Sequence, residues 1–339
     1  MYSVLRNADE RLSMPHVTPK TLINITTGIS SLDAILGSGI PLGSLVLIEE
    51  DEHGYYSRIF TKCFLSEGIT CHDSVFLASK DENPESVIND LPQPIPKKED
   101  KKVTSSEELQ IAWRYKNTQQ VLSEPASLKN SLISHEFDFS CKIPSDKIEC
   151  ADVTIWPKDN RVGNDKCGLI DDILKFTSSL KSCKEPMKAK KIMRVVVQGL
   201  GSPFWQIESQ SIYQVFLKLR TIVHNSCSVA LVTIPSNLFG DQVFNRCMQL
   251  SDIVISLKSL INNNDPSLKE FSGLIKFSKI SPVNSFSIHV PEDIDWAFKV
   301  VKKKLIIQKL HLPPESNLTG QREQDDLASV SMPACQINF

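Results

Sequence analysis

The sequence predicts an α/β fold in which a mostly parallel central sheet is flanked by helices. A strand, a loop and an amphipathic helix follow one another between residues 44 and 68. After Cys167, apolar runs alternate regularly with helical patterns. Strands that alternate with helices favour a parallel sheet with crossover connections. The 339 residues, 41% of them hydrophobic, suffice for one large domain or two small ones with a substantial core.

The first expected elements are a short helix, a tight turn and a buried strand. Ser30 or Ser31 can cap the helix, and Gly37 ends it. Residues 44–48 then form an apolar run preceded by turn residues, as a central parallel strand requires. The helix that follows is predicted to end at Gly68, and it carries apolar side chains on one face: Ile59, Phe60, Cys63 and Phe64.

Strand, loop and helix at this spacing are the frame of a phosphate-binding loop. In a functional loop, G-x-x-x-x-G-K-[ST], the glycine-rich backbone closes on phosphate, the lysine meets the terminal phosphates and the hydroxyl holds magnesium. The motif has four defining positions: two glycines, the lysine and the hydroxyl residue. Here they hold Glu49, Gly54, Tyr55 and Tyr56, so only the second glycine is present.

Residues 49–52 (EEDE) place a run of carboxylates where a polyphosphate would lie. Two like charges ~4 Å apart repel by roughly 1–4 kcal/mol, depending on the local dielectric. The amino end of the following helix favours anions, but these carboxylates would already occupy it. The sequence therefore predicts the frame of a nucleotide hydrolase without its phosphate chemistry.

A second phosphate-handling position is altered in the same direction. In an active enzyme of this kind, a later strand ends in an acid that holds magnesium. The strand expected at 192–197 is followed by Gln198, and a neutral amide is a poorer magnesium ligand than a carboxylate. The loop 198–203 follows at the carboxyl edge of the sheet, where open α/β sheets bind ligands. We interpret the frame as one retained for assembly or shape.

The remaining expected elements continue the alternation. We predict strands at 74–79, 229–234 and 252–257, helices within 81–91, 169–180, 212–223 and 237–247, a hairpin of 273–277 with 285–290, and a last strand at 304–312. Together they predict a single domain over 21–314, with a flexible arm at 1–20, irregular insertions at 92–108 and 116–166, and a polar tail at 315–339.

Composition limits the chemistry further. The formal net charge is −2, so no overall basic field marks a nucleic-acid binder, although a local patch remains open. The nine cysteines contain no C-x-x-C pair. We therefore expect structural thiols in a reducing compartment, with no bound metal or cofactor. No apolar leader or long apolar span is found, which predicts a soluble intracellular chain without membrane contact.

Several segments resemble known proteins. Residues 26–51 (TTGISSLDAILGSGIPLGSLVLIEED) resemble the opening of RecA-like ATPase domains. Further segments resemble the family of the fourth subunit of the Elongator complex: LQIAWRY, HEFDF, VVVQGLGSPFW, SGLIKFSKI and KKKLIIQKLHLPPE. The resemblance covers separate blocks between about 21 and 314.

The resemblance implies a RecA-like subunit that does not catalyse a reaction. Family members form a hexameric ring from three related subunits, here with the fifth and sixth Elongator subunits as partners. The ring is an accessory of the catalytic Elongator core, which modifies wobble uridines of tRNA in cytoplasm and nucleus. It binds tRNA, and nucleotide loosens that binding. Members also lack intact phosphate-loop signatures, so no catalytic residue carries over.

Two sets of residues are candidates for these contacts. Aromatic side chains suited to subunit interfaces are Trp113, Tyr115, Phe204 and Trp205, with ordinary core packing as the alternative. A basic run suited to RNA consists of Lys299, Lys302, Lys303 and Lys304, with protection of an edge strand as the alternative. Two other functions stay open: an active RecA-type ATPase with a degenerate loop, and a monomeric scaffold with a relic fold.

Overall fold

The computed structural model describes residues 24–37, 39–96, 134–157, 165–179, 192–261, 265, 268–280, 296–301 and 304–310. Its centre is a nine-stranded sheet with the order β13-β12-β11-β10-β3-β9-β8-β4-β7. The strands are β3 (Leu45–Glu49), β4 (Ser74–Ser79), β7 (Val153–Trp156), β8 (Met193–Gln198), β9 (Ser228–Ile234), β10 (Ile253–Ser259), β11 (Gly273–Ile280), β12 (Trp296–Val301) and β13 (Lys304–Lys309).

The sheet is mostly parallel, as the sequence predicted. The strands from β10 through β3, β9, β8 and β4 to β7 are all parallel to their neighbours, whereas β11, β12 and β13 extend the sheet in antiparallel pairs. The strand before the phosphate-loop frame, β3, lies between β9 and β10. It is buried on both faces because helices cover both sides, which explains its continuous apolar run.

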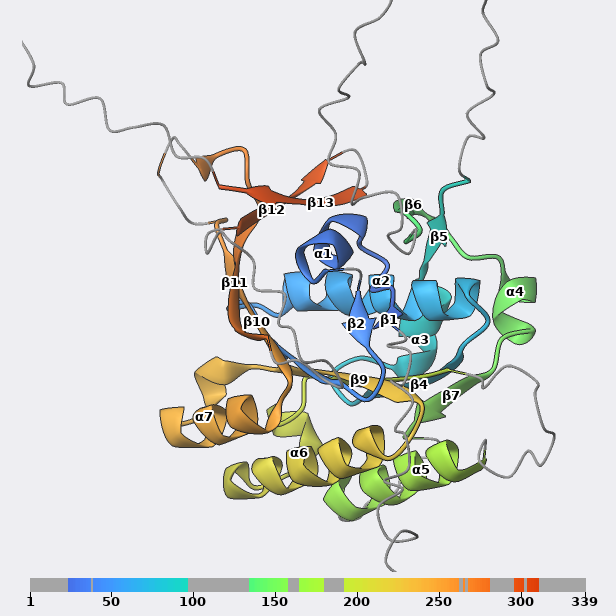
Figure 1. Cartoon of the computed structure of the whole chain (residues 1–339), viewed down its shortest axis with the longest axis vertical. Helices are drawn as coiled ribbons and strands as arrows, with labels where there is room; N and C mark the ends of the chain where they lie inside the picture. The colour runs from blue at the N-terminus through green and yellow to red at the C-terminus, as the bar shows by residue number, and fades with distance from the viewer. Residues whose placement is uncertain are drawn as a thin grey trace, which may run out of the picture.

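Helices form a layer on each face of the sheet (Figure 1). One layer contains α1 (Ser30–Ile35), α2 (Tyr55–Thr70) and α3 (Pro84–Asn89), with α4 (Ser145–Glu149) at its margin. The other contains α5 (Asp165–Ser179), α6 (Ser209–His224) and α7 (Asp241–Leu250). Each layer closes its own hydrophobic core against the sheet. The architecture is the predicted α/β arrangement, with a mostly parallel central sheet between two helix layers.

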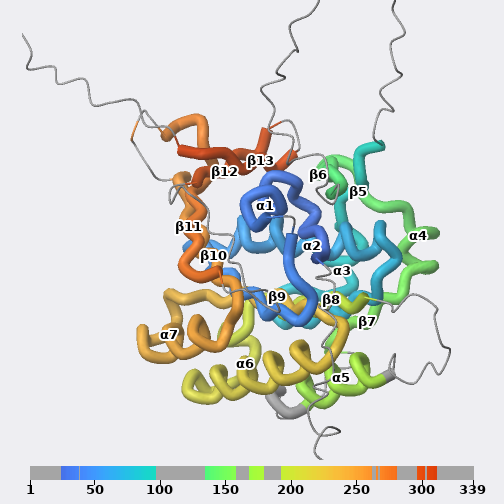
Figure 2. The backbone as a smooth tube through the Cα atoms, viewed as in Figure 1, coloured from blue at the N-terminus to red at the C-terminus, as the bar shows by residue number. Residues whose placement is uncertain are grey.

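Small elements complete the layer that holds α2. Two short ladders are formed by β1 (Asn24–Ile25) with β2 (Ile40–Pro41) and by β5 (Pro92–Pro94) with β6 (Phe137–Lys142). Figure 2 shows α1 next to the carboxyl-terminal strand β13, although they are far apart in the sequence. The backbone amide of Ile307 donates to the Ser31 hydroxyl at 3.1 Å. Ser31 is therefore the hydrogen-bond acceptor for an amide of the outermost strand, β13, and does not cap α1.

The prediction that 116–166 is an irregular insertion is wrong for residues 137–156. This segment contains β6, α4 and β7, and β7 pairs with β4 at the edge of the main sheet. These elements are only four to six residues long and half exposed, so they carry little apolar periodicity. The insertion at 92–108 likewise begins with β5.

Two further expectations need correction. The strand β12 was not predicted, and it is the partner of β13; the predicted hairpin strand at 285–290 lies outside the described residues.

Gly68 does not end its helix, because α2 continues to Thr70. A Cβ atom at Gly68 would lie 2.8 Å from Cδ of Arg194 and 2.9 Å from Cγ2 of Val75, so close packing on the sheet requires glycine there.

Arg194 on β8 is a buried cation that connects separate elements beneath α2. Its side chain is 2% exposed. Nε donates to Asp73 Oδ2 at 2.7 Å, and Nη1 donates to the carbonyl of Thr26 at 2.7 Å. The guanidinium also lies 4.7 Å from the centre of the Phe64 ring on α2. A buried cation with this many partners holds β8, α2 and the residue after β1 in one arrangement.

Replacing Arg194 by Met should lower the free energy of unfolding by about 3–5 kcal/mol, because the buried Asp73 carboxylate loses its cation. Urea denaturation followed by circular dichroism measures the change. The matched control is Arg58→Met, since Arg58 pairs with Glu82 at the same 2.7 Å but is 40% exposed. The control should cost less than about 1 kcal/mol. Equal losses in the two variants would contradict the role assigned to Arg194.

Candidate functional site at the carboxyl edge of the sheet

The frame between β3 and α2 has the predicted geometry. β3 ends at Glu49 and α2 begins at Tyr55. Gly54 precedes the helix with a φ of 62°, in the left-handed region that glycine adopts without strain. Its amide donates to the Asp51 carbonyl at 2.9 Å, which closes a tight turn before the helix. The loop therefore presents the first amides of α2 to one point, as a phosphate-binding loop does.

The carboxylate of Asp51 occupies that point. Oδ1 accepts from the amides of Tyr56 at 3.0 Å and Ser57 at 3.4 Å, and Oδ2 accepts from the amide of Tyr55 at 3.2 Å. Asp51 is only 4% exposed. Free amides at a helix amino end attract anions because of their dipoles and unsatisfied donors. Here the chain's own side chain satisfies them, which confirms the expectation that a carboxylate fills the anion position.

Neighbouring acids in the run 49–52 have different environments. Glu50 accepts from the Thr233 hydroxyl at 2.5 Å. Burial raises the pKa of Glu50 to about 7, and the nearby Asp81 charge acts in the same direction. Glu50 is therefore partly protonated near neutral pH, which relieves some of the repulsion expected from the sequence. Glu49 and Glu52, with Glu50, line a cavity of about 540 Å³ beside β10 and β11.

The two tyrosines do not replace the lysine and hydroxyl of a functional loop. Tyr55 is 57% exposed. Tyr56 is buried, and its ring packs edge-on against Phe298 of β12 with centres 4.8 Å apart. Tyr56 thus joins α2 to the antiparallel end of the sheet, and neither residue brings a positive charge to the loop.

Gln198 lies at the end of β8, where it was predicted. Its side chain is 2% exposed, and among the described residues its Oε1 has no hydrogen-bond partner. The next amide, that of Gly199, donates to Thr233 Oγ1 at 2.8 Å. Since Thr233 also donates to Glu50, one hydroxyl near the end of β9 connects the loops after β3 and β8.

Asp81, which follows β4, completes this edge. It accepts a hydrogen bond from Ser202, and burial raises its pKa above the ordinary range. Sequence reasoning missed both Asp81 and Thr233. Asp81 follows the predicted strand 74–79, and Thr233 lies near the end of the predicted strand 229–234. Because parallel strands end at one edge of the sheet, their positions could have indicated that the two residues lie close together.

The aromatic residues predicted as interface candidates differ in their exposure. Trp205 is 0% exposed and stacks on Trp156 with ring centres 5.4 Å apart, so its prediction as an interface residue is wrong and the core alternative is right. Its indole N–H donates to the carbonyl of Gln198 at 3.2 Å, so the buried Nε1 has a hydrogen-bond acceptor. Phe204 beside it is 65% exposed. Trp113 and Tyr115 lie outside the described residues.

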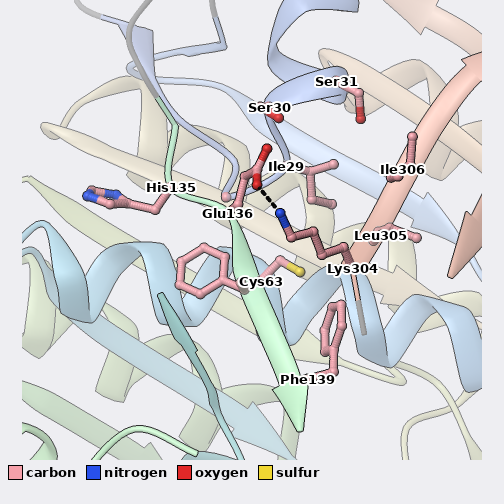
Figure 3. A pocket seen from close by; sticks show the side chains of 12 residues that line it. Ile29, Ser30, Ser31, Cys63, His135, Glu136, Phe139, Lys304, Leu305 and Ile306 are labelled. Carbon is pink, nitrogen blue, oxygen red and sulfur yellow. Dashed lines mark hydrogen bonds and ion pairs between the residues drawn. The ribbon is translucent and has the colours of Figure 1, made fainter. Parts of the chain in front are cut away.

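The basic run is only partly described. Lys299 on β12 places its ammonium 5.9 Å from the Phe271 ring centre. Lys304 on β13 forms an ion pair with Glu136 at 2.6 Å. Figure 3 shows this pair at a cavity of about 250 Å³ between α1, β6 and β13. Lys302 and Lys303 lie outside the described residues.

The carboxyl edge is thus that of a phosphate-loop α/β protein whose anion position is filled by its own carboxylate.

Within the described residues, no helix combines the length and apolar character needed to span a bilayer.

The chain belongs to the PAXNEB protein family, which matches residues 17–336. It is 32% identical to Elongator complex protein 4 of Xenopus laevis, over 90% of this chain and 83% of that protein. It is 30% identical to Elongator complex protein 4 of Mus musculus, over 90% of this chain and 81% of that protein. A solved structure, the KaiC-like protein PH0186 of Pyrococcus horikoshii OT3, matches with a TM-score of 0.47 and 12% identity over 85% of this chain and 99% of that chain.

Replacing Asp51 by Ala should lower the free energy of unfolding by about 0.5–2 kcal/mol, because three amides at the start of α2 lose their acceptor. Thermal or urea denaturation measures this change. Glu52→Ala is the matched control, since Glu52 is an exposed acid in the same loop, and it should stay within about 0.5 kcal/mol of the parent. Equal stability of the two variants would show that Asp51 does not hold the helix.

Proposed function

We propose that this chain is a non-catalytic subunit of Elongator. In this proposal it assembles with the two related fifth and sixth subunits into a hetero-hexameric ring that binds tRNA and supports wobble-uridine modification by the catalytic core. Membership of the PAXNEB family and the name shared by the curated relatives support an Elongator subunit. The finer parts of the proposal rest on the resemblance of the sequence to that family. They are the ring, tRNA binding and residence in cytoplasm and nucleus.

The observation that carries the non-catalytic role is the Asp51 carboxylate on the amides of α2. A triphosphate at this position must displace a buried acceptor and approach Glu50 as well. The positions that would compensate for that repulsion hold Tyr55 in place of lysine and Gln198 in place of the magnesium acid. Binding of nucleotide in this loop is therefore opposed at each step.

Exposed apolar side chains at the same edge favour its use as a subunit contact. Tyr55 is 57%, Phe204 65% and Leu238 55% exposed. They follow the carboxyl ends of β3, β8 and β9, three adjacent parallel strands. Aromatic residues are enriched at protein interfaces, and ring subunits contact one another through two different surfaces. An edge without nucleotide can serve such a contact.

Co-expression with the two candidate sister subunits should give a hexamer with two copies of each, measured as the mass of the intact assembly. Phe204→Asp should weaken this assembly, because it places a charge in an apolar contact. Leu217→Asp is the control, since Leu217 is 50% exposed on the helix α6 rather than in the loops at the carboxyl edge.

A chain that stays monomeric with the sister subunits present would favour the relic scaffold. Magnesium-dependent ATP turnover by the purified chain, absent from a sample without magnesium, would favour the degenerate ATPase.

Charge reversal of Lys299, Lys302, Lys303 and Lys304 to Glu should weaken tRNA binding by the assembled ring, with the largest loss at low salt. Each phosphate contact removed makes the negative slope of log affinity against log salt shallower by about 0.7–0.9, because phosphate contacts release counterions. Filter binding over a salt series measures the slope. Lys218→Glu on the exposed side of α6 is the control. Unchanged binding in the reversed variant would leave these lysines as edge protection only.

A further inference from the structure

Three metal-ligating side chains meet at the carboxyl end of α2, away from the edge described above. Glu67 and Cys71 are one helical turn apart, at the end of α2 and at its cap. His135 approaches from the residues that lead into β6. Oε1 of Glu67 lies 3.7 Å from Sγ of Cys71 and 3.2 Å from Nδ1 of His135. One potential ligand atom from each residue lies within 4.8 Å of the others.

These separations fit a tetrahedral ion. With Zn–S of about 2.3 Å and Zn–N and Zn–O of about 2.0–2.2 Å, tetrahedral ligands place oxygen and nitrogen about 3.4 Å apart and oxygen and sulfur about 3.6 Å apart. The two separations to Glu67 Oε1 are within a few tenths of an ångström of these values. The third separation, between the imidazole and the thiol, is at most 4.8 Å.

The surroundings of the cluster are those of a metal site. Glu67 is 1% exposed, and the Thr26 hydroxyl donates to its Oε1 at 2.5 Å, which orients the carboxylate. Cys71 is exposed and the His135 side chain is 33% exposed, so an ion can enter from solvent. Figure 3 shows the His135 imidazole pointing away from the Glu136–Lys304 pair, so that ion pair does not compete for it.

We propose that Glu67, Cys71 and His135 form a site for a divalent ion of the zinc class, with the fourth position open to solvent. A mixed sulfur, nitrogen and oxygen set favours Zn²⁺ over Mg²⁺ or Ca²⁺, which prefer oxygen ligands alone. The ion would join α2 to the residues entering β6, and it would add to the hydrogen bonds that connect His135 to Glu67. The site is independent of the proposed Elongator role.

Metal binding must displace the thiol proton. A cysteine thiol is mostly protonated at neutral pH, and the Glu67 carboxylate next to Cys71 further disfavours the thiolate. Ligation by sulfur requires the thiolate, and metal binding should therefore release a proton. The same Glu67 charge that disfavours the thiolate in the empty site attracts the ion and offsets this cost.

The test uses the full chain, stripped with a chelator and then titrated with Zn²⁺ against a chelating dye of known affinity. We expect one ion per chain bound at this site. Cys71→Ser and His135→Gln should each weaken its binding by at least about tenfold, the lower end of what losing an outer-shell partner costs. With Co²⁺ in place of Zn²⁺, the parent should show a thiolate-to-cobalt charge-transfer band that Cys71→Ser lacks.

Controls separate this site from the other cysteines of the chain. Cys141→Ser removes an exposed thiol on β6. His72→Asn removes an exposed imidazole next to Cys71 at a φ of 60°, a conformation that Asn tolerates. Both should bind Zn²⁺ and Co²⁺ as the parent does. A parent chain that binds no ion, or binding unchanged by both ligand substitutions, would overturn the site and leave a hydrogen-bonded cluster.

Discussion

The contact between the Asp51 carboxylate and the first amides of α2 is the constraint on which the rest of the structure depends. A buried helix start needs acceptors for its free amides, and a nucleotide hydrolase supplies them with phosphate. This chain supplies them with a side chain four to six residues away in its own sequence. The frame of strand, loop and helix is then complete without a ligand, and it can be kept for its shape.

The helix held in this way is the centre of its layer. Its amino end reaches the antiparallel strands through Tyr56 and Phe298. Its second half packs on Arg194 and needs a glycine at position 68 to do so. Its carboxyl end carries Glu67, which accepts hydrogen bonds from Thr26, directly after β1, and from His135, before β6. A shift of α2 would therefore disturb the buried ion pair, the far end of the sheet and the small ladders together.

Sequence reasoning predicted the parallel core well, because β3, β8 and β9 are buried on both faces and read as continuous apolar runs. It also placed Gly54, Tyr55 and Gln198 in their observed positions. It missed β7 and β12, which lie at or near the sheet's edges and carry mixed burial. It misjudged Trp205, since an aromatic residue in a glycine-rich loop reads as exposed, whereas stacking on Trp156 depends on a tertiary contact. The particular acid that caps α2 required coordinates, because four adjacent carboxylates compete for one position.

The most direct test of the central claim is a crystal structure of the full chain grown with a large excess of ATP and magnesium. The account predicts that the amides of Tyr55, Tyr56 and Ser57 still donate to Asp51, with no phosphate in the loop. Phosphate oxygens on these amides, with the Asp51 side chain turned away and magnesium bound beside Gln198, would contradict it.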